Sequence, residues 1–275
     1  MNFQTHFSGA VFSQKKTLAV ASAVCLINRR VFVVFLCCVF ICTESQSAIV
    51  ATWDMESNTP SDVSDNGIGP VIFAESGARV GASTLSGVHA SAASDWTTPA
   101  GNGSSNSYNA NNWAVGDYFQ ISTDTSGFQD ITLTFDQTSS STGPGEFTLA
   151  YRTGGSGAFT DFMNYTVSNT SWSSSGSPKA ASNYDFNFAA VSVLNDAASV
   201  DFRLVLRSDL DASPPGNIGV SGTSRIDNII VTGTSLTAVP EPSTFALLAS
   251  ACLGAVVRYR CRKSGIPHFE QSNKI

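Results

Sequence analysis

Apolar and polar residues alternate singly along several segments of the chain, and this alternation is the clearest structural signal in the sequence. It occurs in segments that begin near residues 119, 131, 147, 184 and 200. A period of two residues is that of a β-strand with one buried face. Turn-forming stretches rich in Ser, Gly and Pro separate the segments, and none has the 3.6-residue period of an amphipathic helix. The pattern predicts a mainly β protein built as a single antiparallel β-sandwich.

The apolar members of the alternating segments are expected to form the core of this sandwich. The residues predicted to be buried are Ile131, Leu133, Phe135, Phe147, Leu149, Phe202, Leu204 and Leu206. Their polar neighbours are expected to face solvent, because successive side chains of a strand point to opposite faces of the sheet. Most Asp residues fall in turns or at outward positions, so we interpret them as solubilising surface groups.

Residues 81–112 differ from the alternating segments, since more than half of them are Ser, Thr, Asn or Gly. We interpret this region as a long solvated loop. It contains Trp96 and Tyr108, and Trp113 follows directly. Aromatic rings pack well against the C–H groups of sugars, so the alternative interpretation is a glycan-stacking platform formed by these three residues.

The amino-terminal segment has the features of a secretory signal peptide. The apolar run VFVVFLCCVFIC, residues 31–42, follows Arg29 and Arg30 and precedes small polar residues. We expect residues 1–47 to be a signal peptide with an extended basic region, cleaved before Ala48. The alternatives are a buried core helix and a retained anchor. Twelve helical residues span only about 18 Å, however, which is short of a bilayer core of about 30 Å.

The carboxy-terminal segment combines a short motif, an apolar run and a basic cluster. The motif is formed by Val239, Pro240, Glu241 and Pro242. Residues 245–257 follow without a charge, and the basic cluster consists of Arg258, Arg260, Arg262 and Lys263. Prolines interrupt the preceding structure. An apolar helix followed by basic residues is typical of a stop-transfer anchor whose basic end stays in the cytoplasm.

Residues 239–263 resemble the PEP-CTERM sorting signal of bacterial envelope proteins. The resemblance implies that exosortase, an integral-membrane cysteine protease, recognises the Pro-Glu-Pro motif and processes the protein during export. It divides the chain into the signal peptide at 1–47, the β-sandwich at 48–237, the sorting signal with its transmembrane helix at 238–263, and a short polar cytoplasmic tail at 264–275. Members of the family usually end just after the basic cluster, so the tail is a departure from the pattern. The alternative is a plain single-pass anchor.

Composition and charge narrow the class of protein further. Charged residues make up 13% of the chain, and the formal net charge is −6. Residues 44–241 carry a net charge of −14, whereas the two ends together carry +8. This distribution excludes a coiled coil, a charged disordered chain and a basic nucleic-acid-binding protein. All six cysteines lie in the terminal segments, so the central domain has no disulfide, thiolate metal site or cysteine nucleophile.

The central domain resembles the jelly-roll domains that precede PEP-CTERM tails and that occur in carbohydrate-binding modules. The segments that carry the resemblance are residues 52–56, 131–144 and 225–231. The resemblance implies that the first and last strands pair and close the sheet. It also implies a structural calcium ion between these strands, with carboxylates from Asp54 or Glu56 and from Asp227. The alternative is that these acids are unliganded surface groups, and the sequence establishes no cofactor with certainty.

The central domain offers little for catalysis. Its single histidine, His89, lies in the Ser-rich stretch, where we expect it to be exposed to solvent. No Gly-rich phosphate-binding loop and no paired-histidine metal motif occurs in the sequence. We therefore expect a protein without enzymatic activity.

The terminal signals set the expected function and location. We expect a cell-surface or extracellular-matrix protein that crosses the inner membrane through the secretion translocon and is sorted by exosortase. A secreted carbohydrate-binding module that interacts with extracellular polysaccharide is the alternative, and a polysaccharide-active enzyme is the third interpretation.

Overall fold

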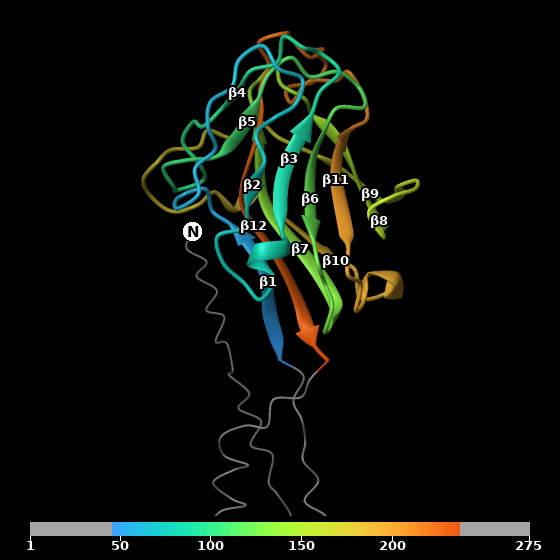
Figure 1. The fold of residues 1–275 in the computed structure, drawn as a ribbon. Helices are drawn as coiled ribbons and strands as arrows, with labels where there is room; N and C mark the ends of the chain where they lie inside the picture. Colours follow the sequence, from blue (N-terminus) through green and yellow to red (C-terminus); the bar gives the residue numbers. More distant parts are fainter. Residues whose placement is uncertain (1–45, 237–275) are drawn as a thin grey trace, which may run out of the picture. The chain divides into compact units, whose positions relative to one another are not determined.

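A computed structural model of the chain describes residues 46–236, which fold mainly as β-strands (Figure 1). The strands are β1 (Ser47–Trp53), β2 (Ile72–Phe73), β3 (Thr84–Val88), β4 (Trp96–Thr97), β5 (Tyr108–Ala110), β6 (Tyr118–Thr123), β7 (Phe128–Ser139), β8 (Glu146–Thr153), β9 (Thr160–Thr166), β10 (Asn183–Asn187), β11 (Val200–Leu206) and β12 (Ser224–Ser235). Three short 3-10 helices connect them: η1 (Val80–Ala82), η2 (Ala180–Ser182) and η3 (Ser192–Leu194). Within this described range, no helix has the length and apolar character needed to span a bilayer. The predicted signal peptide and transmembrane helix lie outside the described residues.

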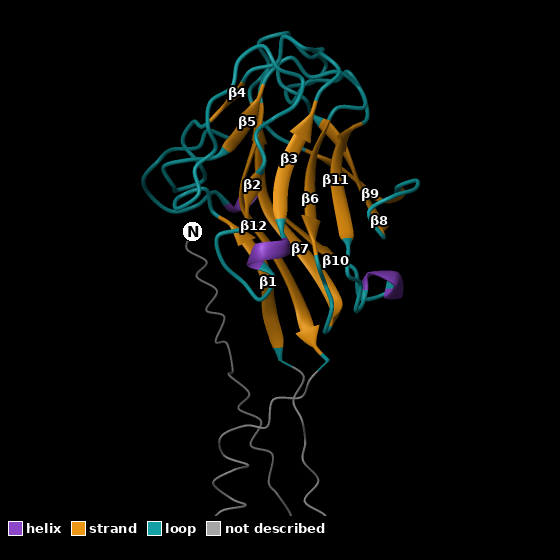
Figure 2. Ribbon diagram, viewed as in Figure 1, coloured by secondary structure: helices purple, strands orange, loops and turns teal. Residues whose placement is uncertain are grey.

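The strands form two antiparallel sheets, which confirms the predicted β-sandwich. Sheet A has the strand order β10-β7-β12-β5-β4, with β1 also paired to β12. Sheet B has the order β2-β3-β6-β11-β8-β9. Contacts between the two sheets include Tyr108 of β5 with Phe119 of β6, whose ring centroids are 5.7 Å apart. Loops gather at the end of the sheets opposite to the start of β1 and the end of β12 (Figure 2).

The first and last described strands pair with each other, as the jelly-roll resemblance implies. Ser47 of β1 lies opposite Thr234 of β12. Strand β12 is an interior strand, because it pairs with β7 on one side and with both β1 and β5 on the other. The two ends of the described chain therefore leave the sandwich side by side (Figure 1).

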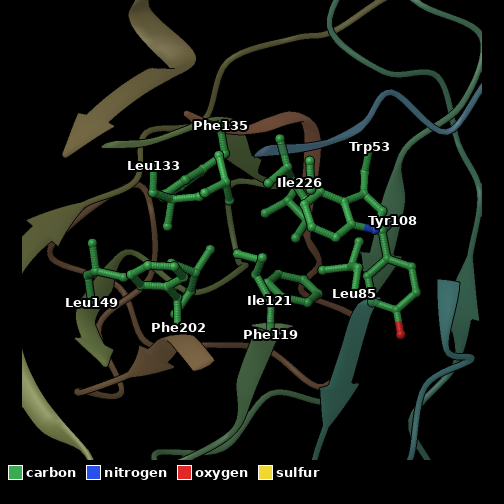
Figure 3. Close-up of a cluster of buried hydrophobic side chains, with 14 of the residues drawn as sticks. Trp53, Leu85, Tyr108, Phe119, Ile121, Leu133, Phe135, Leu149, Phe202 and Ile226 are labelled. Carbon is green, nitrogen blue, oxygen red and sulfur yellow. The ribbon is translucent and has the colours of Figure 1, made fainter. Parts of the chain in front are cut away.

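The eight residues predicted to form the core are all fully buried, so that prediction is confirmed. Figure 3 labels Leu133, Phe135, Leu149 and Phe202 among the buried side chains of both sheets. Tyr165 of β9 adds an aromatic contact that the alternation alone does not reveal. Its ring lies 6.0 Å from that of Phe135 and 5.7 Å from that of Phe147, measured between centroids. The core is thus closed near the β9 and β10 edges by aromatic side chains.

The interpretation of residues 81–112 as a long solvated loop is wrong. The region contains β3, β4 and β5. Glycines allow the Trp96 ring of this region to pack closely: a Cβ atom at Gly87 would lie 2.3 Å from the ring, and one at Gly69, which precedes the region, would lie 2.6 Å from it. Strands of two and three residues are too short to show a readable period of two, which is why the sequence pattern missed β4 and β5.

Truncation of a core aromatic side chain should be far more destabilising than truncation of its outward neighbour. Phe135 is fully buried and packs within 6.0 Å, between ring centroids, of Tyr165, Tyr184 and Phe186. We expect Phe135→Ala to lower the free energy of unfolding by about 3–5 kcal/mol. The half-buried Thr134 is the matched control, and Thr134→Ala should cost less than about 1 kcal/mol. Denaturant unfolding measures both, and equal costs would contradict the assigned inward and outward faces.

Candidate functional site

The predicted glycan-stacking platform is not formed, because its three aromatic side chains are buried. Trp96, Tyr108 and Trp113 have exposed fractions of 1%, 1% and 6%. Their polar atoms donate hydrogen bonds to backbone carbonyls: the Trp96 indole N–H to Asn66, the Tyr108 hydroxyl to Pro70 and the Trp113 indole N–H to Ala110. These rings are part of the core under the loops, and they offer no face to a sugar.

His89 is also buried, which overturns the expectation that it is exposed. Its ring lies between those of Trp96 and Trp113, with centroid distances of 4.7 and 4.2 Å. Its Nδ1 is hydrogen-bonded to the Ser94 hydroxyl at 2.9 Å and lies 3.8 Å from a carboxylate oxygen of Asp117. Burial lowers the pKa of His89 to about 4, so the ring is neutral at pH 7.

The grouping of Ser94, His89 and Asp117 does not have the geometry of a catalytic triad. In a triad the carboxylate and the nucleophile contact different ring nitrogens. Here both groups face Nδ1, and Nε2 has no hydrogen-bond partner among the described residues. Ser94 is fully buried, so no substrate reaches its hydroxyl. We assign the grouping a structural role.

The three predicted calcium ligands do not converge on one site. Glu75 occupies the place next to Asp54: its carboxylate accepts the backbone N–H groups of residues 54, 55, 57 and 58. Glu56 accepts the backbone N–H of Asn106, and Asp227 is fully buried. Residues 46–236 contain no group of three or more His, Cys, Asp or Glu side chains arranged to hold a metal ion. The predicted calcium site, in which Asp54 or Glu56 acts together with Asp227, is therefore not supported by a cluster of acidic ligands in these residues.

Asp227 instead forms a buried acidic pair with Asp136. The two residues lie opposite each other in strands β12 and β7, and their exposed fractions are 0% and 4%. The interpretation of the Asp residues as surface groups is wrong for this pair. Burial, with a smaller contribution from the charge of Asp136, raises the pKa of Asp227 to about 6. The carboxyl groups are enclosed, so the pair does not have the open, water-accessible geometry that glycoside hydrolysis requires.

The acidic pair holds a loop and a bulge in place through hydrogen bonds. Asp227 accepts the backbone N–H of Asn102 and the hydroxyl of Ser104. Asp136 accepts the side-chain amides of Asn102, Asn183 and Asn228. The pairing register of β12 shifts after Asp227, and Asn228 has a positive φ of 50°. The pair is thus the anchor for the segment near residue 102 on the outer face of sheet A.

A polar pocket of about 380 Å³ lies beside this anchor. It is lined by Thr97, Pro99, Asn109, Ser139, Ser140, Asn169, Thr170, Ser171, Thr223 and Arg225. The strand residues that alternate with Thr97, Asn109 and Arg225 face the core, since Trp96, Tyr108 and Ile226 are buried there. The pocket therefore opens on the outer face of sheet A, between the segments near residues 99 and 170.

The sequence pattern did not predict the pocket or the acidic pair, because both depend on contacts between segments that are distant in sequence. Asn102 and Asp227 are 125 residues apart in sequence, and Asn102 and Asp136 are 34 apart. The only local signal is the polar character of outward strand positions such as Asn109 and Arg225, which solvent exposure explains equally well. The predicted sorting residues Val239, Pro240, Glu241 and Pro242, and the basic cluster at 258–263, lie outside the described residues.

Comparisons with known proteins do not assign the chain to a family. No protein-family model and no curated protein matches it. Similar solved structures include the K3 cleaved adhesin domain of Lys-gingipain from Porphyromonas gingivalis, at 12% identity and a TM-score of 0.35, covering 68% of this chain and 100% of that one. They also include the K2 cleaved adhesin domain of Lys-gingipain, at 13% identity and a TM-score of 0.32, covering 69% and 99%. Similarity this low supports no conclusion about function, and the fold assignment depends on the strand pairing described above.

Replacing His89 with an uncharged residue should make the protein more tolerant of acid. The pKa of His89 is lower in the folded state, about 4, than its ordinary value of 6.5, so the unfolded state binds more protons between these values. Wild-type stability is therefore reduced by about 2–3 kcal/mol through this residue as the pH falls from 7 to 4. His89→Asn should remove this loss. Urea unfolding of wild type and variant at pH 7 and pH 4 measures it, and an unchanged pH dependence would show that His89 is not buried as described.

Asp227→Asn should make the protein less tolerant of acid, which is the opposite of the effect expected for His89→Asn. The pKa of Asp227 is about 6 in the folded state, above its ordinary value of 3.8, so this residue contributes stability at low pH that is lost as the pH rises through 6. Removing the carboxyl should therefore make the variant lose about 2–3 kcal/mol more than wild type between pH 7 and pH 4. A variant that loses less than wild type would contradict the buried position of Asp227.

Proposed function

We propose that the protein is a non-enzymatic cell-surface or extracellular-matrix protein that is exported and sorted by exosortase through a PEP-CTERM tail. The observation that carries this proposal is the sequence at 239–263, in which the Pro-Glu-Pro motif, an uncharged run and a basic cluster follow one another. The signal peptide proposed at 1–47 supplies entry to the secretion translocon. The inner membrane and exosortase are then the partners of the tail.

The boundaries of the sandwich support this division of the chain. Strand β1 begins at Ser47, one residue before the proposed signal-peptide cut, and β12 ends at Ser235. The proposed sorting motif begins four residues later, at Val239. Every described strand residue except Ser47 therefore lies between the two proposed processing sites, and cleavage at both sites removes only Ser47 from the paired strands.

The position of both chain ends supports a display role. Because Ser47 pairs opposite Thr234, the sandwich is joined to its proposed signals at one end only. An anchor at that end would leave the opposite end, where the loops gather, facing away from the membrane (Figure 2). This arrangement suits a domain that is presented to the surroundings.

The chemistry of the described sites supports a role without catalysis. His89 and Asp227, whose pKa values are strongly shifted by burial, are enclosed in the fold and engaged with neighbouring groups. The polar pocket is lined by no Asp, Glu or His residue. A general acid or base must reach the reacting atoms, and these arrangements place none there.

Substitution of the sorting motif should block processing without changing the stability of the sandwich. We expect the triple variant Pro240→Ala, Glu241→Ala and Pro242→Ala to accumulate as an unprocessed membrane-bound form in a host that has exosortase. Its melting temperature should equal that of wild type, because the motif lies beyond β12. Immunoblots of membrane and extracellular fractions measure the processing.

The matched control is a triple alanine variant at Gln271, Ser272 and Asn273, which changes three residues of the same tail outside the motif. It should be processed like wild type. Equal processing of the motif variant and the control would contradict recognition of the motif, and recovery of the full chain from the cytoplasm would contradict export.

A further inference from the structure

The walls of the polar pocket are fixed by contacts within the fold, which makes the pocket a preformed cavity. The segment near residue 102 is bound to Asp227, as described above. The segment near residue 170 is bound to Thr138 of β7, whose hydroxyl donates to the carbonyls of Ser168 and Thr170 and accepts the N–H of Thr170. A ligand would therefore meet an ordered site and would not have to organise a loop on binding.

Asn109 presents an unpaired acceptor in this pocket. The side chain is 94% buried, since its exposed fraction is 6%. Its Nδ2 donates to the Thr97 hydroxyl at 2.8 Å, which fixes the orientation of the amide. Its Oδ1 accepts no hydrogen bond from the described residues and is not one of their enclosed unpaired atoms, so this oxygen is open to the pocket. A hydroxyl group of a bound molecule would satisfy this oxygen.

Arg225, which lies opposite Asn109 in the pairing of β12 with β5, supplies charged donors beside it in the same pocket. One N–H of its guanidinium donates to the carbonyl of Ala100 at 2.8 Å, and its Cζ lies 5.1 Å from the centroid of the Trp172 ring. These contacts hold the side chain in one position. The N–H groups that remain have no acceptor among the described residues, so they can donate to a ligand.

The charge around Arg225 disfavours an anionic ligand. Arg225 is the one charged residue in the lining. Its positive charge interacts with Asp227, two residues further along β12, and Asp136 lies opposite Asp227. An anion bound to Arg225 would therefore also be repelled by this acidic pair. An apolar ligand is disfavoured as well, because Pro99 is the one apolar residue of the lining.

We propose that the polar pocket binds the end of a neutral glycan through one or two sugar units. Sugar hydroxyls both donate and accept hydrogen bonds, which matches a lining of Ser, Thr and Asn side chains with one guanidinium. The volume of about 380 Å³ is at the small end of ligand pockets, so it suits a terminal unit and excludes the interior of a polymer lying flat.

The place of the pocket along β12 suits contact with an external glycan. Arg225 is near the start of β12, and the chain leaves the sandwich at Ser235. Ten residues of β-strand span about 33 Å. The pocket is therefore remote from the end at which the proposed anchor is attached. The proposal goes beyond the sorting function and does not depend on it, because binding is measured without exosortase.

The test uses the full chain purified in a mild detergent and probed on an array of neutral glycans, uronate-containing glycans and sulfated glycans. We expect binding to neutral glycans that share one terminal sugar, and competition by the free monosaccharide or disaccharide of that terminus. Binding confined to anionic glycans, binding that the free sugar does not compete, or no binding to any neutral glycan would each overturn the proposal.

Variants of exposed residues locate the binding site. Ser171→Trp and Asn169→Trp place a large ring at the pocket, and each should abolish binding with little change in melting temperature. Ser156→Trp, on the exposed turn between β8 and β9, is the matched control and should bind like wild type. Asn109→Ala should weaken binding about tenfold through the loss of one hydrogen bond. Full binding by both pocket tryptophan variants would overturn the proposal.

Discussion

The rest of the structure depends on the pairing of β12, the last described strand, in the interior of sheet A. It lies between β7 on one side and β1 and β5 on the other, so three other strands of the sheet are joined through it. Its inward residues Ile226, Ile229 and Val231 are fully buried. Burial of three such side chains contributes about 5–9 kcal/mol, which is comparable to the whole stability of a typical domain. The sandwich therefore requires the whole of β12, and it is complete only in a chain that extends to residue 235.

The two ends of β12 have different roles in the proposed function. At one end the strand holds β1, which brings the start and the end of the described chain together. At the other end it carries Arg225 and Asp227, which organise the polar pocket and the segment near residue 102. A single strand thus connects the proposed point of attachment with the proposed glycan site. This connection explains how a domain could be held by one end and remain free to bind at the other.

The sequence predicts the parts of the fold that follow from local alternation. Residues such as Phe135 and Leu204 lie in strands long enough to show a period of two, and they are buried as expected. The predicted pairing of the first and last strands is also confirmed. The buried state of Trp96 and His89 could not be predicted in this way, because it results from short strands and from glycines that admit large rings. The polar residues next to Trp96 and His89 in the sequence led to the incorrect prediction of an exposed loop.

The candidate site was less predictable than the fold for a related reason. A charged residue in a strand usually faces solvent, and the sequence contains no sign that Asp136 and Asp227 face each other beneath a loop. Their burial is made tolerable by donors from Asn102, Ser104 and Asn228, which come from segments far apart in the chain. Such convergence is a property of the folded domain, so only the strands that carry Asp136 and Asp227 could be identified beforehand.

The most direct test of the role of β12 is equilibrium unfolding of two truncated chains, residues 48–236 and residues 48–223. The longer chain retains every strand from Ala48 onward, and the shorter one lacks β12. We expect residues 48–236 to unfold in one cooperative transition and residues 48–223 to show no such transition, with cooperativity restored by a peptide of residues 224–236. A cooperative β-sheet transition in residues 48–223 alone would contradict the conclusion that β12 completes the fold.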